Sequence, residues 1–346
     1  MINVTIIGAC GYAGGELLRL LLQHPQVEIT HLLDTAFTGQ DVASIFPYLQ
    51  GFIQKEIEDL PYEKVAADSD VIFMATPHGQ GIAPAIAAVA AGKKLIDIGT
   101  DFRFRDVAVY EKWYGVKHTA AELSAQAIYA LPEFYRDQIK SAKVVANPGC
   151  YPTASLLALY PLLKEGLVEP GTIIIDAKSG TSGAGRKPAV GNLFAECGDS
   201  FKAYGVATHR HTPEIEQEIA HISGIEQTVS FTPHLLPMIR GIHATVYANL
   251  RLKTDGETLT KLYRHIYQNE YFVRVHEHGE WPQTKWASGT NLCHLAVTYD
   301  PRTGRAIVCS VIDNIGKGAA GQAIQNMNIL FDLPEQTGLQ LAPMYP

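Results

Sequence analysis

The sequence predicts an α/β fold with two domains, one of them built on a parallel sheet. Short β-branched segments alternate with helix-length segments from the first residues onward, as in successive β-α-β units. The chain has 346 residues, which is long for a single hydrophobic core. After about residue 150 the expected strands become longer and alternate polar with apolar residues. This alternation indicates a sheet with one face open to solvent.

The first expected domain alternates strands and helices. Residues 2–7 (INVTII) are typical of a buried strand that ends at Gly8, and a helix is expected over 13–24 because Pro25 stops it. Because helix-length connections join the strands, the sheet should be parallel. Further strands are expected over 27–33, 71–75, 94–98 and 143–146, with a helix over 81–91.

The second expected domain starts after Pro148. A helix is expected over 153–164, and strands over 172–177, 242–252 and 306–312. The last strand leads into "DNIGKGAAGQAIQNMNIL". We expect this loop and helix to belong to the first domain. We therefore predict one domain from 1–148 with about 311–346, and a second domain from 149–310.

Composition and charge exclude several classes of protein. The net charge of −7 argues against general nucleic-acid binding. The five cysteines are odd in number and form no C-x-x-C pair, which argues against a disulfide scaffold and favours a reducing compartment. No stretch approaches the ~20 apolar residues of a membrane helix, and the start lacks a basic signal-peptide region. We expect a soluble cytoplasmic protein that binds no membrane.

"GACGYAG" places glycines at 8, 11 and 14 between a predicted strand and a predicted helix. This spacing suits a Rossmann-type dinucleotide site, where glycines allow a tight turn and close approach of a pyrophosphate to the helix N-terminus. The alternative is a merely tight strand-to-helix turn. The candidate cofactor contacts are Gly8, Gly11, Tyr12, Gly14, Pro77, Ser179, Gly180 and Asn314.

"NPGCYPTA" places Cys150 between a Pro-Gly turn and a predicted helix. Backbone N–H groups and the helix dipole favour a thiolate at such a position. The alternative is a small apolar core residue, as most free cysteines are. Cys150 follows a strand of the predicted nucleotide domain, and ligands bind beyond the carboxyl ends of parallel strands. A thiol beside a hydride carrier suggests a thioester that is reduced to a thiohemiacetal.

"ATHRHTPEIEQEI" offers an acid/base near such a thiol. His209 and His211 are two residues apart, so on an extended stretch they would share one face. Glu214 lies in the first turn of a helix that Pro213 should open. One histidine could exchange a proton with the thiol while the other residues position it or bind substrate. A metal site is the alternative, but nothing else in the chain has ligand spacing, so we expect no metal.

Basic residues gather in the same candidate segments. Arg103, in "TDFRFR", is a candidate contact for a substrate carboxylate or phosphate, since an arginine fork suits either group. The alternative for any one arginine is a solvated surface charge. "SGTSGAG" is not a Walker A loop, because no Gly-Lys-Ser/Thr follows it.

Taken together, these motifs resemble the N-acetyl-gamma-glutamyl-phosphate reductases of arginine biosynthesis. The resemblance covers almost the whole chain in the same order, and "PGCYPTA" with "HRHTPE" is its most specific part. Aspartate-semialdehyde dehydrogenases have a similar plan but a different cysteine motif. The matching segments are "GACGYAGGEL", "DFR", "NPGCYPTA", "SGTSGAGRKP", "YGVATHRHTPEI", "FTPHLLPMIRGI" and "DNIGKGAAGQAIQN".

The resemblance implies a reaction and a role for each site residue. Cys150 would displace phosphate from N-acetyl-glutamyl-5-phosphate, and NADPH would reduce the thioester to N-acetyl-glutamate 5-semialdehyde. His209 would be the general acid/base, while His211, Glu214 and Arg103 would shape the substrate site. The second domain would be an α+β catalytic and dimerisation domain, and the protein a homo-oligomer, either a dimer or a tetramer.

One segment departs from the family pattern. After the second strand, family members commonly carry a Ser/Arg-rich stretch that suits the adenosine 2′-phosphate, whereas this chain has "DTAFTGQ" with Asp34. Use of NAD is therefore possible beside NADP. Three other functions stay open: the same chemistry on a longer acyl phosphate of the aminoadipate type, a cysteine hydrolase, or a non-catalytic nucleotide sensor.

Overall fold

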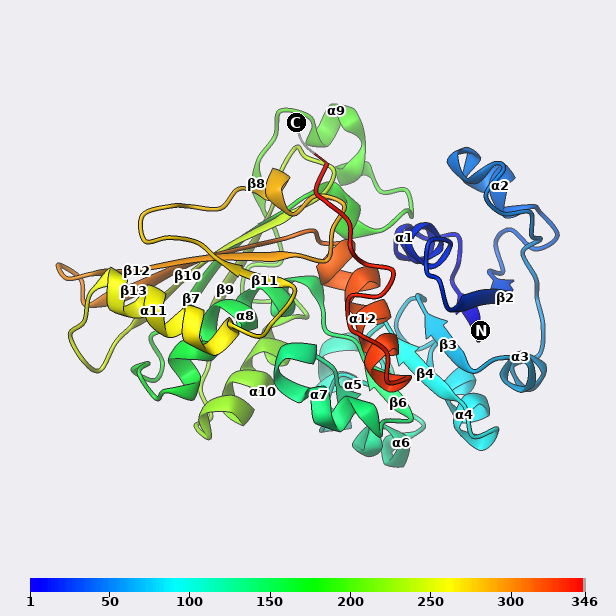
Figure 1. The fold of residues 1–346 in the computed structure, drawn as a ribbon, viewed down its shortest axis with the longest axis horizontal. Helices are drawn as coiled ribbons and strands as arrows, with labels where there is room; N and C mark the ends of the chain where they lie inside the picture. Colours follow the sequence, from blue (N-terminus) through cyan, green and yellow to red (C-terminus); the bar gives the residue numbers. More distant parts are fainter. Residues whose placement is uncertain (345–346) are drawn as a thin grey trace. The chain divides into compact units, whose positions relative to one another are not determined.

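The computed structural model describes residues 1–344, which form two compact units (Figure 1). Unit 1 comprises Met1–Pro148 and Ala319–Gln340, and unit 2 comprises Gly149–Gly318 together with residues 341–344. The chain thus returns to unit 1 about eight residues later than the sequence predicts. Strand β13 (Arg305–Ile312) is the reason, because it pairs along its whole length with strands of unit 2.

Unit 1 contains a parallel sheet of six strands in the order β2-β1-β3-β4-β6-β5, which confirms the predicted α/β class. The strand predicted over 27–33 is found at those residues, and the others agree within one or two residues. The inner strands are short and mostly buried, as expected of a parallel sheet between helices, whereas the edge strand β2 has only three buried residues. The strands are β1 (Ile2–Ile7), β2 (Val27–Leu33), β3 (Val71–Met74), β4 (Lys94–Asp97), β5 (Ile128–Tyr129) and β6 (Val144–Ala146).

All helices of unit 1 except α12 connect these strands, and their buried faces contribute to its hydrophobic core. Helix α1 (Tyr12–Leu21) ends earlier than predicted, since the chain turns at residues 22–24 before Pro25. Helix α12 (Gly321–Leu330) is buried along its whole length, and Asn326 donates to the carbonyl of Ala130 at 3.0 Å. The others are α2 (Val42–Ile45), α3 (Tyr62–Asp68), α4 (Ile82–Ala90), α5 (Val107–Tyr114), α6 (Ala121–Gln126) and α7 (Pro132–Lys140).

Unit 2 is built on a mixed sheet of seven strands in the order β11-β12-β13-β10-β7-β9-β8. Strand β10 is central and antiparallel to both of its neighbours. The sequence predicted β7 and β10 within a few residues, and both alternate buried with half-exposed side chains. The strands besides β13 are β7 (Ile174–Ser179), β8 (Lys202–Ala203), β9 (Ser230–Leu235), β10 (Ile242–Asn249), β11 (Val273–Val275) and β12 (Cys293–Asp300).

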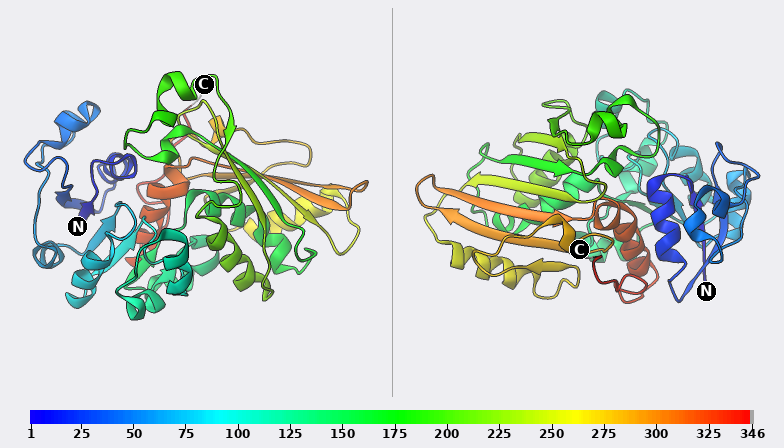
Figure 2. Two further views of the ribbon diagram at one scale, coloured as in Figure 1. Left: turned by 180° about the vertical axis from the view of Figure 1, so that it is seen from behind. Right: turned by 90° about the horizontal axis from the view of Figure 1, so that it is seen from above.

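Helices cover one face of this sheet (Figure 2). Helix α8 (Cys150–Lys164) packs on β10 and β13, and helix α11 (Gly256–Tyr267) packs on β12. Helix α10 (Thr212–Ser223) lies against α8, while the short α9 (Phe194–Cys197) belongs to a loop region after β7. Within residues 1–344, no helix has both the length and the apolar character needed to cross a bilayer.

Candidate active site

The glycine turn of unit 1 joins β1 to α1 and has no room for side chains at two positions. Gly8 has φ +83°, and a Cβ there would lie 2.5 Å from the carbonyl oxygen of Ala75. A Cβ at Gly14 would lie 2.4 Å from the carbonyl oxygen of Gly8. Gly11 differs, because a Cβ there would meet only that oxygen, at 3.6 Å. Side chains are therefore excluded at Gly8 and Gly14, whereas there is free space next to Gly11.

Asp34 follows β2 and its carboxylate lies beside this glycine turn. Oδ2 accepts a hydrogen bond from the N–H of Cys10 at 3.3 Å, and Oδ1 accepts one from the N–H of Ala36 at 3.0 Å. The nearest lysine or arginine on either side in sequence is Arg19 or Lys55. The loop after β2 thus contains the Asp34 carboxylate and threonine hydroxyl groups but no lysine or arginine.

Cys150 is the first residue of α8, three residues earlier than the predicted start of this helix. Gly149 is the N-cap and, among the described residues, α8 has no side-chain cap. The N–H of Gly149 donates to Oε1 of Glu214 at 2.8 Å, and Glu214 is fully buried. A buried carboxylate on α10 therefore holds the turn that presents the partly exposed thiol at a helix N-terminus.

His209 lies among aromatic rings that also surround the start of α8. Its ring centroid is 5.6 Å from that of Tyr151, 5.5 Å from Tyr204 and 5.3 Å from Phe231, and its closest ring neighbour is His211 at 4.9 Å. Burial, with a smaller effect of the neighbouring Arg210 cation, lowers the pKa of His209 to about 4. This ring is therefore a neutral imidazole at physiological pH.

The predicted extended stretch at 209–211 is wrong, because the chain forms turns there. The two rings still meet, since the turn folds His209 back so that its Nδ1 accepts the N–H of His211 at 3.1 Å. The helix that Pro213 was expected to open begins one residue earlier, at Thr212. Glu214 lies in its first turn, as predicted.

Tyr151 and Tyr204 also lie in this cluster, although their sequence patterns predicted no role for them. The hydroxyl of Tyr204 donates to that of Tyr151 at 3.0 Å, and Tyr151 donates to the carbonyl of His234 at 3.2 Å. Burial raises the pKa of Tyr204 to about 12, and the nearby Cys150 thiolate adds to that shift. Both tyrosines lie within motifs quoted above, but nothing in the sequence indicates that these aromatic residues belong to the site.

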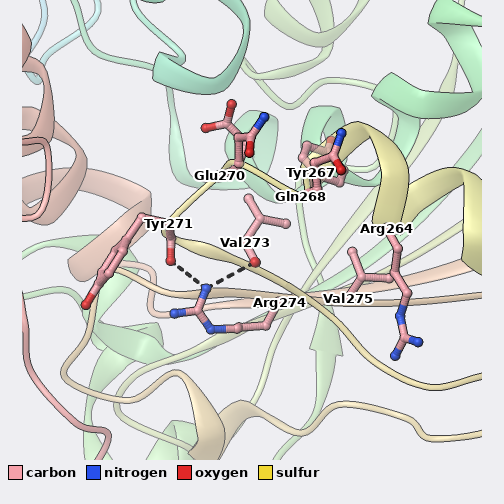
Figure 3. Close-up of a pocket in the computed structure, with 9 residues that line it drawn as sticks. Arg264, Tyr267, Gln268, Glu270, Tyr271, Val273, Arg274 and Val275 are labelled. Carbon is pink, nitrogen blue, oxygen red and sulfur yellow. Dashed lines mark hydrogen bonds between the residues drawn. The ribbon is translucent and has the colours of Figure 1, made fainter.

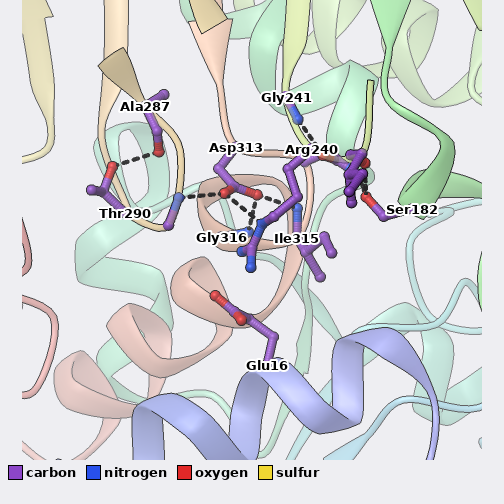
Figure 4. A network of polar contacts seen from close by, with 12 residues as sticks. Glu16, Ser182, Arg240, Gly241, Ala287, Thr290, Asp313, Ile315 and Gly316 are labelled. Carbon is purple, nitrogen blue, oxygen red and sulfur yellow. Dashed lines mark hydrogen bonds and ion pairs between the residues drawn. The ribbon is translucent and has the colours of Figure 1, made fainter. Parts of the chain in front are cut away.

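Asp313 organises the loop between β13 and α12 (Figure 4). Its buried carboxylate accepts from Arg240 Nε at 2.8 Å and from the N–H of Gly289 at 2.7 Å. It also accepts the N–H groups of Ile315 and Gly316 at 2.9 and 3.0 Å. One carboxylate therefore ties this loop to two other loops of unit 2.

This loop also lies against the nucleophile candidate. A Cβ at Gly318 would lie 2.8 Å from Cβ of Cys150, so only glycine fits beside the thiol-bearing residue. Asn314 uses its amide within the protein: Oδ1 accepts from Gly241 at 2.7 Å, and Nδ2 donates to Ser182 at 2.9 Å. Gly180 has a similar spatial constraint, since its Cβ would lie 2.6 Å from the carbonyl oxygen of Ile239.

Arg103 is buried in unit 1 and not displayed as a surface cation. Its Nε donates to the carbonyl of Asn147 and its Nη2 to the carbonyl of Ile98, both at 2.9 Å. These bonds brace the turn that precedes Cys150 in the chain, and the substrate contact of Arg103 stays a prediction. Asp97 is a buried carboxyl group whose charge interacts with Arg103. Burial, with the nearby Asp101 carboxylate, raises the pKa of Asp97 to about 7, although Arg103 acts in the opposite direction.

A pocket elsewhere in unit 2 lies between the end of α11 and β11 (Figure 3). Arg264 pairs with Glu277, and Arg274 donates to the carbonyls of Tyr271 and Val273. Both cations are thus engaged within the protein. In the described part of the chain, no group of three or more histidine, cysteine or acidic side chains could hold a metal ion.

Comparison with known proteins connects this geometry to a family. Residues 3–142 match the model described as "semialdehyde dehydrogenase, NAD binding domain", and residues 150–314 match its "dimerisation domain". An N-acetyl-gamma-glutamyl-phosphate reductase of Desulforudis audaxviator is 51% identical, and one of Desulforamulus reducens is 52% identical, each over 100% of both chains. The chain belongs to the N-acetyl-gamma-glutamyl-phosphate reductase family. The resemblance inferred from the motifs is thereby confirmed.

Solved structures show the same fold at low sequence identity. Aspartate semialdehyde dehydrogenase II of Vibrio cholerae is 18% identical with a TM-score of 0.73, covering 96% of this chain and 98% of its own. The aspartate semialdehyde dehydrogenase of Candida albicans, solved with NADP, is 14% identical with a TM-score of 0.71 and the same coverage. The two-domain α/β architecture of the reductase family therefore extends to these dehydrogenases.

Proposed function

We propose that this protein reduces N-acetyl-glutamyl-5-phosphate to N-acetyl-glutamate 5-semialdehyde and releases phosphate. The observation that carries the proposal is the start of α8, where a partly exposed thiol follows a glycine N-cap held by the buried Glu214. The identity of about half with reductases of this name, over the full length, supports the substrate.

In this proposal Cys150 is the nucleophile. The helix N-terminus stabilises its thiolate, which attacks the acyl carbon and displaces phosphate to leave a thioester. His209 stays a prediction as the general acid/base, and the ring of Tyr204 packs against it. Glu214 and Asp313 hold the two backbone segments that meet at Cys150. His211 and Arg103 stay predictions as parts of the substrate site.

The residues of unit 1 fit a dinucleotide. The turn is closed at Gly8 and Gly14 but open at Gly11, and in the described chain no side chain caps α1. Uncapped N–H groups at a helix start suit a pyrophosphate. When bound, the nicotinamide exchanges the hydride with the carbonyl carbon. We propose NADP as the cofactor with NAD also accepted, while Tyr12, Pro77, Ser179, Gly180 and Asn314 remain predicted contacts.

We further propose that unit 2 mediates self-association into a homo-oligomer. The description of the matching family model as a dimerisation domain supports this. Large apolar side chains after β7 are strongly exposed, among them Val190, Leu193, Phe194 and Phe201, and such patches are typical of interaction surfaces. Light scattering coupled to size-exclusion chromatography measures the oligomeric state, and a monomer at micromolar concentration would contradict the proposal.

The decisive experiment follows phosphate-dependent reduction of NADP by N-acetyl-glutamate semialdehyde. The assay is repeated with the semialdehyde that is one methylene longer. This comparison is needed because one methylene changes the free energy of discrimination between substrates by only ~1–3 kcal/mol. Turnover that requires phosphate supports the proposal. A faster rate with the longer compound would assign the aminoadipate-type reaction. Ester hydrolysis without nucleotide would indicate a hydrolase, and nucleotide binding without turnover would indicate a sensor.

A further inference from the structure

A buried carboxylate in unit 1 holds the loop that connects β3 to α4. Asp101 is only 3% exposed and lies just after β4, the strand that pairs with β3. Its Oδ1 accepts the N–H of Gly79 at 2.7 Å, and its Oδ2 accepts the N–H of Gly81 at 2.8 Å. Both oxygens of one side chain are therefore bonded to the backbone of residues 75–81, which we call the β3–α4 loop.

Other groups fix the Asp101 carboxylate itself. The hydroxyl of Tyr110, on α5, donates to Oδ1 at 2.7 Å, and the backbone N–H of Asp101 donates to Oδ2 of Asp97 at 3.0 Å. His118 Nε2 donates to the carbonyl oxygen of Asp101 at 2.8 Å. The side chain and both backbone groups of Asp101 thus have partners outside the β3–α4 loop. Such a carboxylate is a rigid support, and hydrogen bonds to a charged acceptor are the stronger ones in proteins.

The β3–α4 loop begins against the glycine turn of unit 1. A Cβ at Gly8 would lie 2.5 Å from the carbonyl oxygen of Ala75 and 3.3 Å from Cγ2 of Thr76. The loop and the turn are therefore adjacent at the carboxyl ends of β3 and β1, which pair in the parallel sheet. Ligands of open parallel sheets bind beyond the carboxyl ends of the strands. A dinucleotide at the glycine turn would consequently have this loop as one side of its site.

The composition of the β3–α4 loop explains why it needs such support. Gly79 has φ +84°, and a Cβ there would lie 3.1 Å from Cγ1 of Val116, so this position suits glycine. Gly81 is the second glycine of the loop, and glycine has the largest conformational freedom to lose. A loop that becomes ordered only when its ligand binds lowers the affinity for that ligand. Two hydrogen bonds to a charged acceptor order this loop in advance.

We propose that Asp101 is a positioning residue for the dinucleotide, because its carboxylate holds the β3–α4 loop in the conformation that contacts the cofactor. This inference rests on the proposed function, since it takes NADP as the ligand of the glycine turn. The motif resemblance assigned no role to Asp101, although this residue opens the "DFR" segment. Asp101 takes no part in the covalent steps and acts only through the backbone of Gly79 and Gly81.

Nucleotide binding to the full chain distinguishes this role from a general contribution to stability. In Asp101→Asn one acceptor oxygen becomes an N–H2 donor, so one of the two bonds to the loop is lost. The Kd for NADPH, measured by isothermal titration calorimetry, should rise ~10–100-fold, as expected for one lost hydrogen bond to a charged group. KM for NADPH should rise with it, whereas kcat at saturating NADPH and KM for the acyl substrate should stay within ~3-fold of wild type.

Two further variants serve as controls. Asp106→Asn alters an exposed carboxylate that also accepts a backbone N–H, that of Ala108 at 2.9 Å, but this bond lies at the start of α5. It should leave the Kd for NADPH unchanged. Tyr110→Phe removes a donor to Asp101 but keeps both loop bonds, so the Kd should change by less than ~3-fold. A folded Asp101→Asn with the wild-type Kd would overturn the inference, as would an equal rise of the Kd in Tyr110→Phe.

Hydrogen exchange of the wild-type chain tests the inference even if Asp101→Asn does not fold. Because Asp101 accepts the N–H groups of Gly79 and Gly81, peptides that cover 75–81 should exchange slowly without ligand, and still more slowly with saturating NADPH. Fast exchange without ligand, or a rate that NADPH leaves unchanged, would contradict the positioning role. A wild-type chain that does not bind NADPH would instead overturn the proposed function, on which this inference rests.

Discussion

The two units each contain a helix that begins at a glycine and lacks a side-chain cap, but the two helix starts are built differently. Gly11 precedes α1 with φ −77° and ψ 172°, and Gly149 precedes α8 with φ −66° and ψ 156°. The N–H of Gly11 bonds to the carbonyl of Gly8, whereas that of Gly149 bonds to the buried carboxylate of Glu214. The backbone conformation is thus shared while the supporting groups differ.

The difference shows how one local structure serves two chemical purposes. At the start of α1, a Cβ added at Gly11 would meet only the Gly8 carbonyl oxygen, at 3.6 Å, so this position leaves room for a ligand. Helix α8 begins with Cys150, which places the protein's own sulfur in the same electrostatic environment. A ligand anion can dissociate from the first helix start, so backbone support is sufficient there. The second must hold a covalently reacting atom, and a buried carboxylate and a packed glycine, Gly318, restrict it.

The largest expected effect concerns the sulfur itself. Cys150→Ser should fold, bind nucleotide and lose at least ~10³-fold in kcat, since a serine hydroxyl is a far weaker nucleophile than a thiolate. Cys10→Ser, Cys197→Ser, Cys293→Ser and Cys309→Ser are the matched controls and should retain most of the activity. Steady-state kinetics with a nucleotide titration measures both properties. Near-normal turnover of Cys150→Ser would exclude the nucleophilic role.

A smaller effect is expected from closing the other helix start. Gly8→Ala should lower the free energy of unfolding by ~2–4 kcal/mol, because alanine disfavours φ +83° and its Cβ would meet the Ala75 carbonyl. Gly39→Ala is the matched control, with φ +80° and no atom within 4 Å of the added Cβ. It should cost only ~1 kcal/mol. Urea denaturation compares them, and equal losses would contradict the close-contact argument.

The carboxylate that supports the cysteine turn should matter less than the sulfur. Glu214→Gln keeps the shape and one acceptor oxygen but removes the charge, so the Gly149 turn should loosen and kcat should fall ~10–100-fold, with little change in KM. Glu216→Gln, on the same helix, is the control and should leave kcat near wild type. A change in KM alone would show that Glu214 binds substrate and does not position Cys150.

The smallest effect concerns cofactor choice near α1. With Asp34 beside the glycine turn and no nearby cation in its loop, kcat/KM for NADPH should exceed that for NADH by less than ~10³, because each lost charged hydrogen bond is worth ~1.5–3 kcal/mol. Asp34→Ser should raise the NADPH to NADH ratio ~10-fold. Asp41→Ser, which caps a separate short helix, is the control. A wild-type ratio well above ~10³ would show that another segment binds the 2′-phosphate.

Sequence patterns predicted the strands better than the contacts of the site. Residues 27–33 could be placed because β-branched and apolar residues dominate this stretch up to Asp34, although only three of its seven residues are buried. The start of α8 was missed because Pro152 resembles a helix stop, although proline fits the first turn of a helix. Arg103 donates to the carbonyls of Asn147 and Ile98, and such main-chain acceptors have no sequence signal.

The discontinuity of unit 1 has a consequence for biosynthesis on the ribosome. Helix α12 supplies buried residues to this unit, and Asn326 and Asn328 hydrogen-bond to Ala130 and His24 near its other elements. Unit 1 is thus translated first but cannot complete its packing until residues 319–340 have emerged. The stretch 149–318 lies between its two parts. Domains generally fold in order of synthesis. In this nascent chain, however, the ribosome completes the segment that forms unit 2 before it supplies the last segment of unit 1.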